Sequence, residues 1–202
     1  MIYLVRHGQT EFNRQDRFQG RVDSPLTDLG IAQAKAVGER LAALAAAEPG
    51  GWRIEVSPLG RARETARIIA EIMGLAEPAI EPRLIEVSYG DMESLTREEV
   101  DARWPHMAGV RGTFGRAPGG ETLDELQARA RSWLAEREAA PGARLIAVAH
   151  ASIGRMLRGL YAGLGIDETR ALETPQDAFH RLHEGRVERI DCPELPSGAL
   201  ER

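Results

Sequence analysis

The first residues of the chain constrain its fold most strongly. Residues 2–5 form a short apolar, partly β-branched run. Such a run is typical of a strand buried on both faces, although a segment of a core helix can show the same pattern. The run leads directly into Arg6-His7-Gly8, so polar side chains follow where the strand ends. Because open α/β sheets bind ligands at the carboxyl ends of their strands, we expect the functional site beside residues 6–8.

Each of these three residues suits a site for an anion. The guanidinium of Arg6 offers a fixed fork of donors for an oxyanion. The imidazole of His7 can act as a nucleophile or as a base near neutral pH. Gly8 lets the backbone approach another segment closely or take a positive φ. On its own the tripeptide is a weak signal, and a histidine that only caps a turn remains the alternative.

A single domain is the default for a chain of 202 residues. We expect it to span residues 1–190, with a frayed tail over 191–202, where two prolines and few apolar side chains occur. The hydrophobic content of 43% and the charged content of 28% are typical of a soluble globular protein. The net charge of −5 argues against a general role at nucleic acids or at membrane surfaces. All basic residues except Lys35 are arginine. Because arginine is this common along the chain, only the position of an arginine, and not the number of arginines, is evidence for phosphate binding.

Cysteine and hydropathy patterns narrow the class of protein further. Cys192 is the only cysteine, which excludes an intrachain disulfide and a zinc site built from several cysteines. No signal peptide precedes the first strand, and no apolar stretch is long enough to span a membrane, so we expect a cytoplasmic protein. His180 and His183 lie three positions apart in a predicted strand, which puts them on opposite faces and argues against a metal site.

Strand-like and helix-like stretches alternate along the chain. This alternation predicts an α/β fold. Before the predicted tail of residues 191–202, the sequence contains no internal repeat and no linker that would divide it. The expected strands are 2–5, 52–56 and 144–149, with a closing hairpin of 178–182 and 187–190. The expected helices begin at Thr27, near Arg61, at Thr96, at Thr122 and at Ser152.

Two further predicted strands also lead into polar chemistry. Strand 52–56 leads through Ser57 into a helix whose first turn contains Arg61. A cation there opposes the helix dipole at a cost of about 0.3–1 kcal/mol. We therefore expect an anion between the helix N-terminus and the guanidinium. Strand 144–149 is followed by His150, so one edge of one sheet would gather Arg6, His7, Arg61 and His150.

Four stretches resemble, in this order, the motifs of the histidine phosphatase superfamily, which is also called phosphoglycerate mutase-like. They cover most of the first 155 residues. The resemblance implies a three-layer αβα sandwich with a mostly parallel central sheet. The stretches are MIYLVRHGQTEFN (1–13), SPLGRARETA (57–66), LIEVSYGDMES (84–94) and VAHA (148–151).

The resemblance also implies roles for individual residues. His7 is the expected nucleophile that forms a phosphohistidine, and Glu86 is the expected proton donor, which afterwards activates water. Positive charge on the arginines, together with the second histidine, is expected to offset the charge of the transferring phosphoryl group. No metal and no cofactor is expected. The residues of this charge-offsetting set are Arg6, Arg61 and His150, and the expected substrate-binding residues are Asn13, Gln19, Gly20 and Ala151.

Three positions depart from the family's pattern. Met92 stands in place of Trp and Ser94 in place of Gly, and we expect this stretch near the outer wall of the pocket, where it would affect substrate preference. Ala151 stands where Gly is usual, and its N–H can still contact an anion unless the position needs a positive φ. Glu93 is expected to be structural. The glycine-rich stretch 107–120 is expected to be either a flap over the pocket or a plain connector.

The family contains both phosphatases and mutases, which share the first half-reaction. Between Glu86 and His150 this chain has 63 residues, fewer than the family's cofactor-dependent mutases usually carry there. The resemblance therefore favours a phosphatase that acts on a small phosphorylated metabolite, with a small-molecule phosphate ester as the expected partner and no prediction of oligomeric state. A cofactor-dependent phosphoglycerate mutase remains the alternative, because surface arginines could hold a second anion; a protein that binds phosphorylated ligands without turnover is a further alternative. The arginines in question are Arg14, Arg17 and Arg21.

Overall fold

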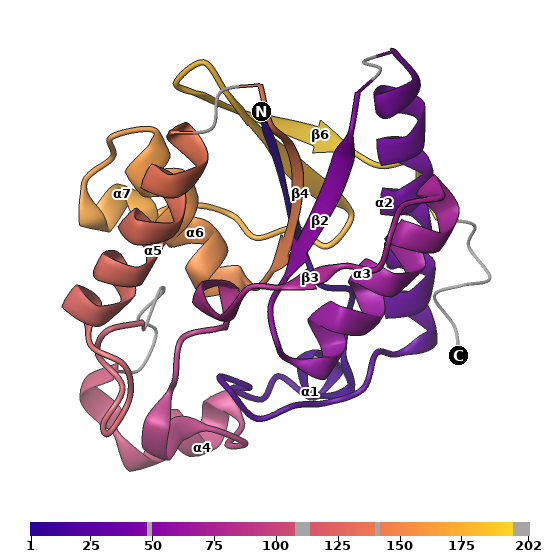
Figure 1. The fold of residues 1–202 in the computed structure, drawn as a ribbon. Helices are drawn as coiled ribbons and strands as arrows, with labels where there is room; N and C mark the ends of the chain where they lie inside the picture. The colour runs from indigo at the N-terminus through magenta and orange to yellow at the C-terminus, as the bar shows by residue number, and fades with distance from the viewer. Residues whose placement is uncertain (48–49, 108–113, 140–141, 196–202) are drawn as a thin grey trace.

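The computed structural model describes residues 1–47, 50–107, 114–139 and 142–195 (Figure 1). Within them a central sheet has the strand order β3-β2-β4-β1-β5-β6. The first four strands along the chain run parallel to one another, and the last two form an antiparallel hairpin on one side of β1. The strands are β1 (Ile2–Arg6), β2 (Trp52–Val56), β3 (Ala79–Ile80), β4 (Arg144–Ala149), β5 (Ala178–His183) and β6 (Arg186–Asp191).

The helices begin where the sequence carries capping residues. Thr27 accepts the N–H of Gly30 at 3.0 Å, and Thr96 and Thr122 each form a capping box with the glutamate three positions later. Such caps contribute about 1 kcal/mol each. The helices are α1 (Glu11–Arg14), α2 (Asp28–Ala47), α3 (Gly60–Met73), α4 (Arg97–Arg103), α5 (Leu123–Glu138), α6 (Ala151–Tyr161) and α7 (Ile166–Ala171), with short 3₁₀ turns at Pro82–Leu84, Gly90–Met92 and Pro105–Met107.

Two hydrophobic cores lie on the two faces of the sheet. In one of them α2 and α3 pack on the sheet through side chains such as Val37, Leu41 and Ile69. In the other, α5 and α6 pack on the opposite face through side chains such as Trp133 and Leu157. Figure 1 shows these helix pairs on either side of the strands. The expected three-layer αβα sandwich with a mostly parallel sheet is confirmed.

The centre of the sheet contains a change in the direction of the connections. β1 and β4 are neighbours, and Arg6 pairs with Ala149 at their carboxyl ends. The chain leaves β1 toward α2 on one face, and it leaves β4 toward α6 on the other face. A crevice forms at such a switch point in an open α/β sheet, and ligands bind there. The residues that follow β1 and β4 are His7 and His150.

Some short elements have no counterpart among the sequence expectations. One of these elements is α1, which begins at Glu11 and ends at Arg14. Its four residues are too few to show a hydrophobic period, and the helix is held by a capping box between Thr10 and Asn13. The six-residue α7 and the two-residue β3 are too short for the same reason.

The two loop expectations fall partly outside the described residues. The predicted tail over 191–202 begins inside β6, since Asp191 pairs with Ala178. Its residues 196–202 lie outside the described part of the chain. The same holds for residues 108–113 of the predicted flap or connector, whereas Phe114 beside them is fully buried.

Candidate active site

His7 lies directly beyond β1 and is buried, with 3% of its surface exposed. Its backbone N–H donates to the carbonyl of Ala149 at 3.1 Å, which extends the pairing of β1 with β4 by one residue. In the side chain, Nδ1 lies 2.7 Å from the carbonyl oxygen of Gly8. Because a carbonyl oxygen only accepts, Nδ1 carries the ring proton and Nε2 presents its lone pair.

Gly8 fixes the turn that follows His7. A Cβ atom on this residue would lie 2.2 Å from the carbonyl oxygen of Gly30 in α2, so no other residue fits without moving the backbone. The N–H of Gly8 donates to Oγ1 of Thr65 in α3 at 3.2 Å. The expected close approach of the backbone at Gly8 is confirmed, and α2 and α3 together hold the turn.

Arg61 lies in the first turn of α3 and is 2% exposed. Its Nε donates a hydrogen bond to Nε2 of His7 at 3.3 Å. The two terminal nitrogens are held by the loop after α1: Nη2 donates to the carbonyl of Gly20 at 2.8 Å, and Nη1 donates to that of Val22 at 2.9 Å. Gly20 has a φ of +54°, a conformation that favours glycine. The loop therefore aims Nε of Arg61 at the imidazole.

The anion expected at the N-terminus of α3 is the carboxylate of Asp23, a residue of this chain. Its Oδ2 accepts the N–H of Gly60 at 2.5 Å, and its Oδ1 accepts the N–H of Arg61 at 3.3 Å. Oδ1 also pairs with Nη1 of Arg61 at 3.2 Å. The prediction of a ligand site at this helix terminus is therefore wrong, because Asp23 already caps the helix and neutralises that side of the guanidinium.

His150 lies directly beyond β4 and is 1% exposed. The centres of its ring and of the His7 ring are 5.1 Å apart, and the ring planes meet at 60°. Its Nε2 lies 2.6 Å from Oγ of Ser57, the residue that follows β2. The residues that follow three neighbouring parallel strands therefore meet at one edge of the sheet, as expected for the two histidines.

Burial and positive charge keep both imidazoles neutral. Burial lowers the pKa of His7 well below its usual value, and the positive charges of Arg61 and Arg6 lower it further. The pKa of His150 is also lowered well below its usual value, first by burial and then by the charge of Arg61. A neutral imidazole has a lone pair for nucleophilic attack. The geometry and the charges therefore both favour Nε2 of His7 as a nucleophile.

Arg6, the last residue of β1, faces the same site. Burial lowers the pKa of its guanidinium to about 10, and the nearby carboxylate of Glu86 partly opposes this change. Nη1 donates to the carbonyl of Thr174 at 2.5 Å. Nε is buried and has no partner among the described residues. Arg6 is thus held by the backbone and still has a donor for an oxyanion.

Glu86 is buried, and its carboxylate lies at the N-terminus of α6. Oε1 accepts the N–H groups of Val87 at 2.9 Å and of Ile153 at 3.1 Å. Oε2 accepts the N–H of Ser152 at 3.0 Å. Burial lowers the pKa of Arg61. The negative charge of Glu86 is the largest of the influences that oppose this lowering. Glu86 therefore belongs to the same electrostatic site as the arginines. Its hydrogen bonds to the first turn of α6 hold it near His150.

The side chains of Asn13 and Gln19 both form hydrogen bonds with Thr10. Oδ1 of Asn13 accepts the N–H of Thr10 at 3.2 Å and Nε2 of Gln176 at 3.1 Å. Nε2 of Gln19 donates to Oγ1 of Thr10 at 2.7 Å, and Oε1 of Gln19 is buried without a partner among the described residues. The expected substrate-binding residues Asn13 and Gln19 thus belong to one hydrogen-bonded network that begins three residues after His7.

The three departures from the family's pattern have different structural consequences. Ala151 is the first residue of α6 and has a negative φ, so the backbone there does not require glycine. Ser94 does adopt a positive φ of 70°, which glycine would take without strain. Met92 is fully buried in a small cluster that includes Phe18 and Val100. The expectation that this stretch lies near the outer wall of the pocket stays a prediction.

The arginines considered as a second anion grip are already paired. Arg14 forms an exposed ion pair with Glu11 at 2.6 Å, and Arg17 donates to the carbonyl of Ser94 at 2.7 Å. Arg21 lies nearer the site, because its Nε is 3.4 Å from the carbonyl of Glu86. Of the three, Arg21 alone contacts a predicted site residue through a hydrogen bond.

Sequence reasoning missed several residues of this site. Ser57 follows a predicted strand, as His7 and His150 do, so the rule of strand ends could have found it. Asp23 and Gln176 lie in loops without any period, and only the fold brings them to Arg61 and His7. Thr65 lies inside α3, and its hydroxyl accepts the N–H of Gly8.

Two features that the described residues lack bear on other classes of function. No helix in this part of the chain is both long and apolar enough to cross a bilayer. In the same residues, no group of three or more His, Cys, Asp and Glu side chains is arranged to hold a metal ion.

Comparisons with known proteins show which family this chain is similar to. The profile of the histidine phosphatase superfamily (branch 1) matches residues 2–188. A protein named "Probable phosphoglycerate mutase GpmB" from Photorhabdus laumondii is 38% identical over 201 residues, which are 96% of this chain and 86% of that protein. The solved structure of a mycobacterial glucosyl-3-phosphoglycerate phosphatase with VO3 has a TM-score of 0.76 at 28% identity, over 95% of this chain and 97% of that one. A structure described as mycobacterial hydrolase 2 has a TM-score of 0.79 at 27% identity, over 99% and 94% of the two chains.

Proposed function

Because this chain belongs to the histidine phosphatase superfamily, we propose that it hydrolyses a small phosphorylated metabolite through a phosphohistidine at His7. One observation carries this proposal. Nε2 of His7 carries no proton and accepts a hydrogen bond from Nε of Arg61 at 3.3 Å, in a buried site that also contains His150 and Arg6. A neutral nucleophile beside fixed cations suits attack on a phosphate monoester, whose uncatalysed hydrolysis is extremely slow.

In the first step, Nε2 of His7 attacks phosphorus while the bond from phosphorus to the ester oxygen breaks. A new P–N bond forms, and the ring keeps its Nδ1 proton on the carbonyl of Gly8. Donors from Arg6 and Arg61, with His150, offset the charge that the equatorial oxygens carry during transfer. The leaving oxygen departs as an alcohol only if it receives a proton.

We assign that proton to Oε2 of Glu86. Oε1 already accepts two backbone N–H groups, whereas Oε2 accepts one, so Oε2 has a lone pair left for a proton. A carboxyl group protonated there gives the proton to the leaving oxygen and becomes a carboxylate. In the second step this carboxylate takes a proton from water, which attacks phosphorus, breaks the P–N bond and releases inorganic phosphate.

The substrate class follows from the same chemistry and from the relatives. The proposed site recognises a phosphoryl group, and the proposed partner is a small-molecule phosphate ester. The mycobacterial neighbour named a glucosyl-3-phosphoglycerate phosphatase supports a metabolite of this kind. The proposed steps use only side chains of this chain and need no metal.

A phosphoglycerate mutase is the second candidate, because relatives that are 37–38% identical are named probable phosphoglycerate mutases. In a mutase, a bound phosphoglycerate accepts the phosphoryl group in place of water. The short stretch between Glu86 and His150 favours the phosphatase. Incubation with 3-phosphoglycerate and catalytic 2,3-bisphosphoglycerate distinguishes the two: a phosphatase releases inorganic phosphate, and a mutase forms 2-phosphoglycerate.

Hydrolysis of p-nitrophenyl phosphate tests the proposal against a protein that only binds phosphorylated ligands. The wild-type protein is expected to release p-nitrophenol, and a His7→Ala variant is expected to lose this activity. A wild type without turnover that still binds phosphate esters would instead be the binding protein. A panel of phosphorylated metabolites, with released phosphate measured, then identifies the substrate.

A further inference from the structure

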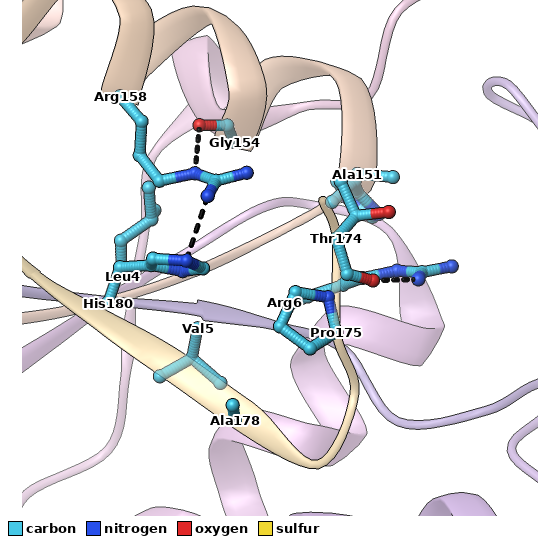
Figure 2. A pocket seen from close by; sticks show the side chains of 11 residues that line it. Leu4, Val5, Arg6, Ala151, Gly154, Arg158, Thr174, Pro175, Ala178 and His180 are labelled. Carbon is cyan, nitrogen blue, oxygen red and sulfur yellow. Dashed lines mark hydrogen bonds between the residues drawn. The ribbon is translucent and has the colours of Figure 1, made fainter. Parts of the chain in front are cut away.

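The segment between α7 and β5, residues 172–176, lies against the N-terminal part of the candidate site. Three successive carbonyls of this segment accept hydrogen bonds from arginines of β1 and α6. Nε of Arg155 donates to Leu172 at 2.6 Å, Nη2 of Arg158 donates to Glu173, and Nη1 of Arg6 donates to Thr174 at 2.5 Å. Figure 2 shows the bond from Arg6 to the Thr174 carbonyl, with Arg158 held by Gly154 and His180 nearby.

The cavity drawn in Figure 2 is lined by Arg6 and His150 among others and is too small to be a substrate pocket. Its volume is only about 20 Å³, whereas pockets for small ligands span roughly 300–1,000 Å³. Arg158, 4% exposed, and His180, 7% exposed, line it. The arginines here therefore support the 172–176 segment.

Gln176, at the end of this segment, reaches two groups of the active-site turn. Its Nε2 donates to the carbonyl of His7 at 3.1 Å and to Oδ1 of Asn13 at 3.1 Å. Both hydrogens of the amide nitrogen are thereby used. Gln176 is distant in sequence from both partners, and its contacts depend on the fixed path of the segment.

The bonds from Thr10 and Gln176 together fix which end of the Asn13 amide is left free. Oδ1 accepts two N–H donors, from Thr10 and from Gln176, so the opposite orientation would place the NH₂ group against both donors. The amide of Asn13 therefore presents Nδ2, a donor, to its remaining surroundings. A donor suits a phosphoryl oxygen, whereas a carbonyl oxygen at the same place would repel it.

We propose that Gln176 is a positioning residue: together with the N–H of Thr10, it orients the Asn13 amide so that Nδ2 donates to the phosphoryl group. This inference rests on the proposed phosphoryl chemistry. Gln176 touches neither the phosphoryl group nor the leaving group. Its effect on the reaction passes through Asn13.

A double-mutant cycle of Gln176→Leu and Asn13→Ala tests the proposal. Gln176→Leu is expected to lower kcat/KM for p-nitrophenyl phosphate about 10- to 100-fold, the range typical of residues that orient a ligand-binding group. In the Asn13→Ala background the same change is expected to cost at most about threefold, because the amide to be oriented is gone. Losses that multiply in the double variant, or a Gln176→Leu variant within twofold of wild type, would overturn the proposal.

Orthovanadate binding to the full chain supplies a readout that does not depend on turnover. The dissociation constant of vanadate is expected to rise in Gln176→Leu by the same factor by which kcat/KM falls, and an unchanged constant would also overturn the proposal. If the wild type binds vanadate but hydrolyses nothing, the proposed function fails while the cycle can still be read from binding.

Matched variants separate positioning from loss of fold. Glu173→Gln changes a side chain of the same segment that pairs with Arg189 on the surface, and it is expected to keep wild-type kcat/KM within twofold. If Gln176→Leu does not fold, as judged by circular dichroism, the isosteric Gln176→Glu takes its place in the cycle. A carboxylate cannot donate to Asn13 or to His7, so the same losses are expected.

Discussion

The Nε atom of Arg61 lies 3.3 Å from Nε2 of His7, the nitrogen that carries no proton. This contact affects both partners. The guanidinium charge disfavours protonation of His7, which keeps the nucleophile available. During transfer, the same charge lies next to the place where the phosphoryl oxygens must pass, so Arg61 serves the ground state and the transition state together.

Replacement of Arg61 by Gln is expected to lower kcat/KM for p-nitrophenyl phosphate by about 10²- to 10³-fold, the loss typical of one oxyanion donor. Arg63→Gln is the matched control, because Arg63 is an exposed arginine of the same helix. Steady-state kinetics of both variants check the prediction. Equal losses in the two variants would mean that general charge, and not the contact with His7, is what matters.

Stability is expected to fall as the pH is lowered from 7 to 5. His7 and His150 have a pKa well below the ordinary value of about 6.5 in the folded state. Below pH 6.5 these histidines therefore bind protons in the unfolded chain but stay neutral in the folded chain. The free energy of unfolding should decrease by about 1.4 kcal/mol per pH unit for each such histidine, until the folded-state pKa is reached.

Urea unfolding of His7→Asn at several pH values isolates this effect from that of the carboxylates. The variant should show a slope smaller by about 1.4 kcal/mol per pH unit than wild type between pH 6 and 5. An unchanged slope in His7→Asn would contradict the burial of a neutral imidazole at this position.

Asp23→Ala is expected to affect stability and activity together. The carboxylate caps α3 through Gly60 and pairs with Arg61, so its loss removes a cap worth about 1 kcal/mol and frees one side of the guanidinium. We expect a small drop in melting temperature and a drop in kcat/KM of about tenfold. Thermal unfolding and steady-state kinetics measure the two effects, and a variant with full activity would separate Asp23 from the positioning of Arg61.

Ser94→Gly is expected to stabilise the protein. Ser94 has a φ of 70°, which costs a residue with a Cβ atom about 1 kcal/mol relative to glycine. Its backbone bonds to Phe18 and Arg17 do not involve the side chain, so they should persist. Thermal unfolding should show a higher melting temperature with unchanged kcat/KM. A lower melting temperature would show that the Ser94 hydroxyl contributes more than the backbone strain costs.

Strong local patterns explain why much of the fold could be predicted. The strand-like stretches of β1, β2 and β4 and the helix starts at Thr27, Thr96 and Thr122 stand out in the sequence. His7, Arg61 and His150 were found because each follows a strand end and because the carboxyl ends of parallel strands meet at one edge.

The residues that were missed act over long distances in the sequence. Asp23 reaches Arg61 across 38 positions, and Gln176 reaches His7 across 169 positions. No period or propensity of a loop encodes such a contact, since it depends on where two separate segments are packed. The expected anion at α3 was assigned to a ligand for the same reason, because the sequence does not reveal that the loop brings Asp23 back to the helix.

The central claim is that His7 becomes phosphorylated during turnover, and a rapid-quench measurement tests it most directly. Wild-type protein mixed with p-nitrophenyl phosphate is quenched with alkali, in which phosphohistidine survives, and the peptide that contains His7 is examined by mass spectrometry. We predict a phosphoryl group on His7 in wild type and none in His7→Ala. Turnover without a phosphorylated peptide, or activity that survives in His7→Ala, would contradict the account.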